Sequence, residues 1–139
     1  MIRISNSIEE TIKIGEALAK RLKPGDVVAL IGNLGAGKTV LTKGIAGGLG
    51  VKDIRYVNSP TFVIIKEYKG RIPLYHFDIY RLNKSSMLDS GSYEEYFYGN
   101  GVTVIEWADK LRSILPKKHI EVRLSVVGEG RRRIEIRKV

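Results

Sequence analysis

The sequence of 139 residues contains no cysteine. Disulfide bonds, thiolate nucleophiles and zinc sites built on cysteine are therefore excluded for this chain. The sequence also lacks any apolar run approaching the ~20 residues that a membrane-spanning helix needs, and its first residues show no signal-peptide pattern. We therefore expect a soluble, cytoplasmic protein with no membrane partner.

Acidic residues are scarce relative to basic ones, with 15 Asp and Glu against 24 Lys and Arg, which gives a net charge of +9. Such an excess is typical of a protein that has an anionic partner beyond a nucleotide. A lysine-rich solvated surface would give the same balance, so the charge alone leaves both interpretations open. The length fits one domain, residues 1–139, and we find no repeat or low-complexity linker.

Residues 32–39 read G-N-L-G-A-G-K-T and match the phosphate-binding-loop pattern G-x-x-x-x-G-K-[ST]. The three glycines allow backbone conformations closed to residues with a Cβ, so that successive N–H groups can turn inward around a phosphate. In this pattern Lys38 reaches the β- and γ-phosphates, and the hydroxyl of Thr39 is placed to bind Mg²⁺. We expect nucleotide contacts from seven consecutive residues: Leu34, Gly35, Ala36, Gly37, Lys38, Thr39 and Val40.

The sequence around this loop predicts a strand before it and a helix after it. Asp26–Ile31 follows the turn pair Pro24-Gly25 and is unbroken apolar sequence after its first residue, which is typical of a strand buried on both faces. Apolar residues then recur at helical spacing after the loop. A cluster of glycines predicts the end of this helix: Gly47, Gly48 and Gly50.

The remaining segments alternate between strand and helix patterns, which predicts an α/β domain. Ser7 and Glu10 form a capping box, and the apolar spacing from Ile8 to Leu22 predicts a helix. Strands are predicted at residues 1–4, 61–68, 72–78, 101–106, 120–127 and 131–137, and a short helix is predicted to end at Leu115. We expect a three-layer fold like that of P-loop NTPases, with a mostly parallel central sheet extended by antiparallel strands.

Two carboxylates at predicted strand ends, Asp78 and Glu106, are candidates for the other half of a nucleotide site. The carboxyl ends of parallel strands face the ligand crevice, so both could approach the same phosphates. One would bind on the magnesium side, and the other would orient or deprotonate the attacking water. A strand-end carboxylate can instead cap the element that follows, so the pattern leaves both interpretations open.

Several other residues fit either a structural or a functional role. His76 lies on an apolar strand and is interpreted as a buried core residue rather than a catalyst. The aromatic residues of 93–98 predict a helix face packed on the sheet, with RNA stacking as the alternative. A basic group fits either a solvated sheet face or a contact with tRNA or an acidic partner: Arg131, Arg132, Arg133, Arg137 and Lys138. Ser7 and Thr11 could border a base pocket, although helix capping explains them as well.

The chain resembles one family, the small ATPase TsaE (also called YjeE) of bacterial tRNA threonylcarbamoyladenosine synthesis. The resemblance covers nearly the whole chain and rests on four segments in the same order. These are G-N-L-G-A-G-K-T at 32–39, V-N-S-P-T-F at 57–62, H-F-D-I-Y-R-L at 76–82 and I-E-W at 105–107. Trp107 in the last segment could cover the nucleotide or a partner surface, or pack in the core.

The resemblance implies roles for individual residues. Lys38 and Thr39 would hold the nucleotide and Mg²⁺, Asp78 would be the second magnesium-side group, and Glu106 would lie at the nucleotide. Ser59–Phe62 would be a switch-type segment in which Thr61 senses the γ-phosphate. The catalytic residues expected on this basis are Lys38, Asp78 and Glu106, and the cofactors are ATP and Mg²⁺.

The resemblance also implies partners. TsaB and TsaD would act with this ATPase to transfer a threonylcarbamoyl group to the adenosine beside the anticodon of tRNA, with TsaC supplying threonylcarbamoyl-adenylate. The chain would meet tRNA directly or through this complex. Because a chain this short has no room for an acceptor-binding domain, we expect hydrolysis that is slow alone and stimulated by the partners.

Two positions depart from the family pattern. Asn33 stands where the family usually has aspartate, at a position that faces away from the phosphates in most such loops, so we expect little effect. Val40 stands where the family often has a second hydroxyl residue, which usually meets the α-phosphate. This second difference bears on nucleotide affinity rather than on the type of reaction.

Two other functions use the same loop. A small-molecule kinase needs a lid and an acceptor-binding insertion, and Arg81–Gly101 is too short for both. A GTP-binding module needs an aspartate that bonds guanine, and the nearest sequence, Asn83-Lys84-Ser85-Ser86, lacks it. Adenine is therefore favoured, and a kinase remains the alternative to a switch ATPase.

Overall fold

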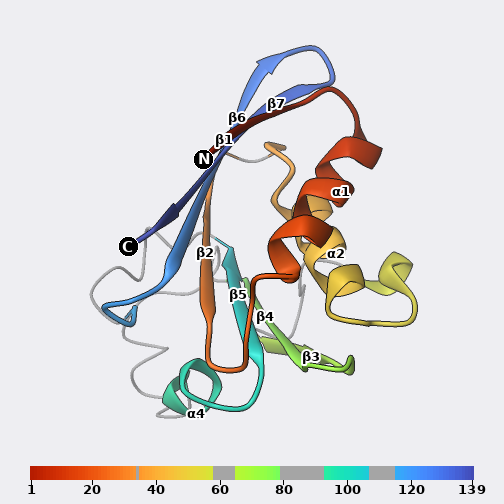
Figure 1. Ribbon diagram of the computed structural model, residues 1–139. Helices are drawn as coiled ribbons and strands as arrows, with labels where there is room; N and C mark the ends of the chain where they lie inside the picture. The colour runs from red at the N-terminus through yellow and green to blue at the C-terminus, as the bar shows by residue number, and fades with distance from the viewer. Residues whose placement is uncertain (34, 58–64, 79–92, 107–114) are drawn as a thin grey trace.

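The computed structural model describes residues 1–33, 35–57, 65–78, 93–106 and 115–139, with Asp78, Tyr93 and Glu94 described by their backbone (Figure 1). The elements follow in chain order: β1 (Ile2–Ser5), α1 (Ile8–Ala19), β2 (Val27–Ile31), α2 (Lys38–Gly48), the 3₁₀ helix η1 (Ile54–Tyr56), β3 (Ile65–Tyr68), β4 (Leu74–Asp78), α4 (Tyr93–Phe97), β5 (Val102–Glu106), β6 (Ile120–Gly128) and β7 (Arg131–Lys138). No helix among these residues is long and apolar enough to cross a membrane.

All seven strands form one mixed sheet in the order β1-β7-β6-β2-β5-β4-β3. β2 lies at its centre and pairs in parallel with both β5 and β6, and β5 pairs in parallel with β4. The outer pairs, β6–β7, β7–β1 and β4–β3, are antiparallel. The predicted α/β fold, with a parallel centre extended by antiparallel strands, is confirmed.

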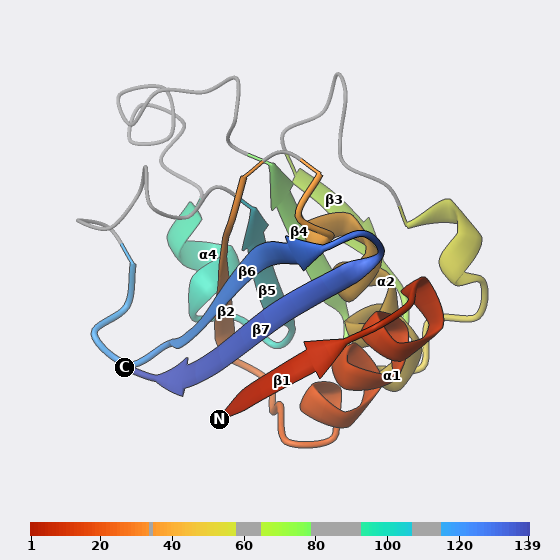
Figure 2. The ribbon, with the colours of Figure 1, turned by 90° about the horizontal axis from the view of Figure 1, so that it is seen from above.

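Helices cover both faces of this sheet, so the molecule has three layers (Figures 1 and 2). Val28 and Leu30 of β2 share a buried cluster with residues of α1 and α2. Val27 and Ala29 point the other way and share a second cluster with Phe97 of α4. Successive side chains of a strand alternate between faces, so an uninterrupted apolar sequence is what a strand covered on both sides requires.

Helix α1 begins at the predicted cap but differs from the prediction at its ends. The Glu10 N–H donates to Ser7 Oγ (3.1 Å), while Glu10 Oε2 accepts from the Asn6 N–H (2.7 Å). Ile8, predicted on the buried face, is 64% exposed. Thr11 is buried instead, because its hydroxyl bonds Ser5 Oγ (2.7 Å) and so satisfies two buried polar groups.

The helix ends at Ala19 rather than Leu22, because the chain tightens into a turn closed by the Leu22 N–H and the Ala19 carbonyl (3.1 Å).

Helices α1 and α2 cross with their backbones in contact. A Cβ added to Gly15 would lie 2.6 Å from the Leu41 carbonyl oxygen, and one added to Gly44 would meet the Ile12 carbonyl. Gly48 belongs to the same contact, since its Cβ would lie 2.9 Å from the Glu16 carbonyl oxygen. The glycine cluster marks the end of the helix, as predicted: α2 ends at Gly48, which also permits the close packing on α1.

The end of α2 is set by Gly50, which has a φ of +89°. The Val51 N–H donates to the Ala46 carbonyl (3.0 Å) and the Gly50 N–H to the Gly47 carbonyl (3.1 Å). This is the Schellman arrangement, in which a residue in the left-handed region satisfies the last carbonyls of a helix. Of the three predicted glycines, Gly48 is the last residue of the helix, and Gly50 supplies the left-handed residue that closes it.

The other boundaries lie close to those predicted. β4 begins at Leu74 rather than Ile72, because Pro73 has no N–H to give to the ladder. β3 is described from Ile65, and residues 61–64 of that predicted strand lie outside the described residues, as does most of the helix predicted to end at Leu115. The 3₁₀ helix η1 was not predicted; the Asp53 carboxylate caps it by accepting from the Arg55 N–H (3.1 Å).

The helix crossing predicts opposite effects for two identical substitutions on α2. Gly44→Ala should lower the free energy of unfolding by about 2 kcal/mol, because the new methyl group must push α1 away. Gly47→Ala is the matched control: its Cβ would contact Ile54 Cγ2 at 3.4 Å, and alanine favours a helix over glycine by up to about 1 kcal/mol. Urea denaturation measures both, and equal loss of stability in the two variants would contradict the crossing.

Candidate functional site

The predicted phosphate-binding loop connects the end of β2 to the start of α2, as its pattern requires. Gly35 and Gly37 have φ values of +80° and +98°, so these two positions need glycine for their backbone conformation. Gly32 needs it for a different reason from the one predicted: its φ is not positive, and a Cβ would lie 2.7 Å from the Leu124 carbonyl oxygen. Close approach to β6 therefore requires the first glycine.

Lys38 folds its side chain back over the loop. It is 5% exposed, and its Nζ donates to the carbonyl oxygens of Gly32 (2.6 Å) and Asn33 (3.0 Å). Gly37, the N-cap of α2, has no side chain to accept from the first N–H groups of the helix. A buried ammonium and a helix N-terminus thus meet at one loop, an arrangement that favours an anion.

Asp78 and Glu106 lie at the ends of neighbouring parallel strands. The register of β4 and β5 pairs these two residues, and that of β2 and β5 pairs Leu30 with Glu106. The Thr39 hydroxyl at the start of α2 donates to Glu106 Oε1 (3.4 Å). The strand ends therefore come together as expected, while the Asp78 side chain lies outside the described residues and the roles of both carboxylates stay predictions.

Glu106 has a second partner that the sequence did not indicate. His76 is fully buried, as predicted, and its Nε2 lies 2.5 Å from Glu106 Oε2, which is itself on a 2% exposed residue. Its Nδ1 has no hydrogen-bond partner. A proton on Nδ1 would be a buried donor without an acceptor, so the proton belongs on Nε2, where it is donated to Glu106.

This contact could not be read from the sequence, because it depends on register. His76 of β4 pairs with Val104 of β5, and Glu106 lies two residues beyond Val104. His76 and Glu106 are therefore diagonal neighbours on the same face of the sheet. Apolar neighbours along β4 indicate burial alone. The contact of His76 with Glu106 can be predicted only once β5 is known to be the neighbour of β4.

The basic C-terminal segment divides into two parts. Arg133 pairs with Glu135 (3.2 Å) and Arg137 with Glu121 (3.7 Å), so these two form the solvated sheet face. Arg132 instead reaches the phosphate-binding loop, where its Nη2 donates to the Gly35 carbonyl (3.2 Å). A basic side chain beside the loop is thus a site residue that sequence spacing did not single out.

The aromatic helix α4 packs on the sheet. The Tyr96 ring lies 5.0 Å from that of Tyr75 and 5.5 Å from that of Phe77, both edge to face, and Phe97 is fully buried. Burial, followed by the charge of Glu67, raises the pKa of Tyr75. Phe97 is therefore a core residue and the partly buried Tyr96 packs against the core, as the predicted helix face requires, whereas Tyr98 is 67% exposed.

Other predicted site residues are placed as follows. Ala36 is buried and Val40 half-buried beside the loop, and Gly35 is exposed. Ser7 and Thr11 have structural hydrogen bonds, as the capping interpretation predicts. Leu34, Thr61 with the rest of Ser59–Phe62, and Trp107 lie outside the described residues.

Oxygen ligands for Mg²⁺ are present at the start of α2. Of the two predicted magnesium-side residues, Thr39 presents its hydroxyl oxygen there, 3.4 Å from Glu106 Oε1, and oxygen is the donor that Mg²⁺ prefers. In the described part of the chain, no three His, Asp or Glu side chains cluster to hold a metal by themselves. These residues fit a magnesium ion that is bound together with phosphate oxygens, as in other phosphate-binding loops.

Comparisons with known proteins agree on one family. The family model described as "Threonylcarbamoyl adenosine biosynthesis protein TsaE" matches residues 5–134. A TsaE protein of Bacillus subtilis (strain 168) is 47% identical over 127 residues, covering 91% of this chain and 78% of the relative. One of Treponema pallidum (strain Nichols) is 40% identical over 134 residues, covering 96% and 97%. The crystal structure of Bacillus subtilis YdiB aligns with a TM-score of 0.78 at 38% identity, covering 96% of this chain and 82% of that one.

The loop geometry predicts that Lys38→Ala weakens ATP binding by at least about tenfold, because a charged donor to the phosphates is lost. Lys43→Ala on the same helix is the control and should bind ATP like the wild type. Isothermal titration with MgATP measures both affinities. An unchanged affinity in the Lys38 variant would refute the assignment of the loop.

Proposed function

Because the chain belongs to the TsaE family of threonylcarbamoyl adenosine biosynthesis proteins, we propose that it is the ATP-hydrolysing switch of the machinery that installs threonylcarbamoyl on tRNA. Family membership confirms the resemblance noted in the sequence and makes the chain a component of this tRNA modification. The residues that perform hydrolysis, the magnesium dependence and the partners TsaB and TsaD belong to the proposal.

One observation carries the catalytic part of the proposal: the hydrogen bond between Thr39 and Glu106 (3.4 Å). It joins the first turn of the phosphate-loop helix to the carboxyl end of β5. When bound, Mg²⁺ would neutralise phosphate charge, and Thr39 with Asp78 would hold it or its waters. Lys38 would release the loop carbonyls and meet the β- and γ-phosphates, while Arg132 would add a second cation beside Gly35.

Glu106 would orient the water that attacks the γ-phosphate. His76 supports this role, because its Nε2 proton fixes Oε2 of the carboxylate and leaves Oε1 on the side of Thr39. A hydrogen bond from a buried donor restricts the carboxylate to one orientation. This lowers the entropic cost of positioning the attacking water. In this proposal His76 positions Glu106 and does not touch the substrate.

The partners would complete what the isolated chain lacks. A loop, a lysine and one Mg²⁺ leave part of the transition-state charge uncompensated and the γ-phosphate open to water. TsaB and TsaD would close the site or contribute a cation, and Ser59–Phe62, with Thr61, would report the nucleotide state to them. tRNA would be reached directly or through this complex.

A small-molecule kinase receives less support. An acceptor-binding insertion would have to lie in Arg81–Gly101, and part of this segment is occupied by α4. Phe97 of that helix is fully buried against Phe77 of β4, with ring centroids 5.8 Å apart. The residues of α4 are thus used by the core of the fold.

We predict that Glu106→Gln lowers turnover by roughly 10²-fold or more while ATP affinity changes less than about threefold, because an amide cannot orient or deprotonate water as a carboxylate does. Glu67→Gln on the exposed face of β3 is the control. Steady-state phosphate release in the presence of partners measures turnover, and titration with MgATP measures affinity. Hydrolysis at the wild-type rate would remove Glu106 from the mechanism.

We predict that TsaB and TsaD together raise the hydrolysis rate at least tenfold, since a cation or closure supplied by a partner is worth on the order of 10³-fold or more in related hydrolases. Phosphate release is measured from the isolated protein and from the reconstituted mixture, with the Lys38→Ala variant as the blank. Full-speed hydrolysis by the isolated protein, indifferent to both partners, would contradict the switch.

A further inference from the structure

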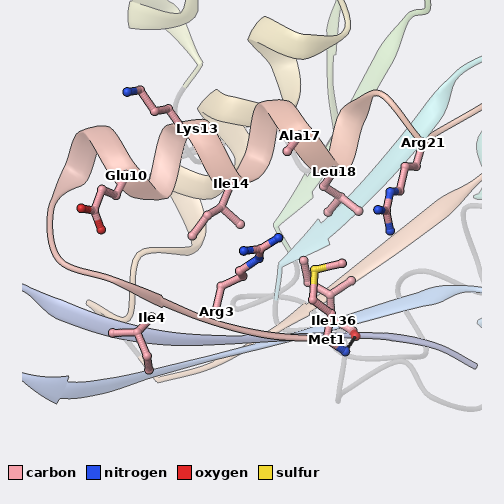
Figure 3. Close-up of a pocket in the computed structure, with 10 residues that line it drawn as sticks. All are labelled: Met1, Arg3, Ile4, Glu10, Lys13, Ile14, Ala17, Leu18, Arg21 and Ile136. Carbon is pink, nitrogen blue, oxygen red and sulfur yellow. Dashed lines mark hydrogen bonds between the residues drawn. The ribbon is translucent and has the colours of Figure 1, made fainter.

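A groove lies between α1 and the edge of the sheet formed by β1 and β7, and it contains no residue of the phosphate-binding loop. Its volume is about 360 Å³, and ten residues line it: Met1, Arg3, Ile4, Glu10, Lys13, Ile14, Ala17, Leu18, Arg21 and Ile136 (Figure 3). The six from Glu10 to Arg21 form two adjacent rows at helical spacing of three or four, 10-13-17-21 and 10-14-18-21. They are therefore one continuous outer stripe of α1 and the turn after it.

The groove combines an apolar floor with two arginines, Arg3 near its middle and Arg21 at one end, and has the acid Glu10 at the other end (Figure 3). Ile14, Ala17 and Leu18 of α1 face Ile136 of β7, and Met1 beside them is 52% exposed. An apolar floor beside basic side chains offers a partner both apolar and charged contacts. The apolar floor also argues against a nucleic acid as the occupant, because phosphate groups gain nothing from contact with apolar side chains.

The cations of the groove are not neutralised by residues in the described part of the chain. Arg3, Lys13 and Arg21 stand against one acid, Glu10, whose Oε2 already accepts from the Asn6 N–H (2.7 Å). Within the described ranges, no residue forms an ion pair with any of the three. In Figure 3 the guanidinium groups of Arg3 and Arg21 point into the space between helix and strands, while Lys13 points away.

We propose that this groove binds an amphipathic helix with acidic side chains on a partner protein. Guanidinium groups beside an apolar surface suit carboxylates, which they bind with two parallel hydrogen bonds. The stripe from Glu10 to Arg21 spans about 16 Å at 1.5 Å per residue, which is long for a compact small molecule and suits three turns of helix. Apolar anchors at helical spacing would fill the floor between the two arginines.

This inference rests on the proposed function, in which partner proteins act on the ATPase. Its position offers a route for that action. Gly15, on the inner side of α1, touches the backbone of α2, which begins with Lys38 and Thr39. A helix bound to the outer side of α1 would thus press on the element that carries the phosphate-binding residues.

The binding test uses charge reversal at the two arginines. The double variant Arg3→Glu, Arg21→Glu should bind the TsaB–TsaD complex at least tenfold more weakly than the wild type, measured by titration against fluorescently labelled complex. Lys52→Glu, Lys69→Glu is the control, since both lysines are exposed outside the groove and the change in net charge is the same. It should bind within threefold of the wild type.

Equal binding by the two double variants would overturn the proposal. Binding of the Arg3→Glu, Arg21→Glu variant to tRNA is measured in parallel. If this variant loses affinity for tRNA alone and not for the TsaB–TsaD complex, the proposal is also overturned, because the groove would then recognise a polyanion. If the wild-type protein itself does not bind the complex, both the proposed function and this inference fall. ATP affinity, measured on every variant, separates a failure of the groove from a failure of the nucleotide site.

A second measurement uses the absence of cysteine from the chain. In the Ala17→Cys variant the new thiol is exposed on the groove floor and is the protein's sole thiol, so its reaction with a maleimide reports access to the groove. TsaB–TsaD, with its own thiols blocked beforehand, should slow this reaction at least fivefold and leave the Lys52→Cys variant unaffected. Equal rates with and without the complex would contradict docking here.

Discussion

The parallel pairing of β2 with β5 and β6 is the constraint on which the site depends. Parallel strands end at the same edge of a sheet, so the loop after β2 and the carboxylate at the end of β5 meet there whatever the sequence between them does. Leu30 pairs with Glu106, and the Thr39 hydroxyl is then within hydrogen-bond distance of that carboxylate. The same pairing brings β6 against the loop, where Gly32 and Leu124 approach closely.

Much of this fold could be predicted from the sequence because its signals are local. Three signals depend only on residues close together in the sequence. They are the continuous apolar run of β2, the glycines of the phosphate-binding loop and the helical spacing of apolar residues. The contact between His76 and Glu106 depends on how two strands align, and Arg132 reaches Gly35 because β7 folds back along β6. Such contacts follow from register, which spacing along one strand does not contain.

The differences from the predictions arise where tertiary contacts act on a residue. Gly48 is the last residue of α2, as the glycine cluster predicts, and it has a second role that the pattern does not show, since α1 leaves no space for a side chain there. Ile8 continues the apolar periodicity and still faces solvent, since a pair of hydroxyls occupies the buried place at Thr11. Tertiary contacts thus override a local preference worth about 1 kcal/mol.

The place of β7 between β1 and β6 has a consequence for how the protein is made. β1 pairs with β7, the last strand in the sequence, and the Met1 amine donates to the Ile136 carbonyl (3.0 Å) (Figure 2). β2 lies between β5 and β6, which both follow it in the sequence. A nascent chain that has left the ribosome as far as α2 carries the whole loop sequence but neither neighbour of β2. The two strands that flank β2 and its loop therefore become available only after β5 and β6 have been translated, so the site forms through contacts that are distant along the chain.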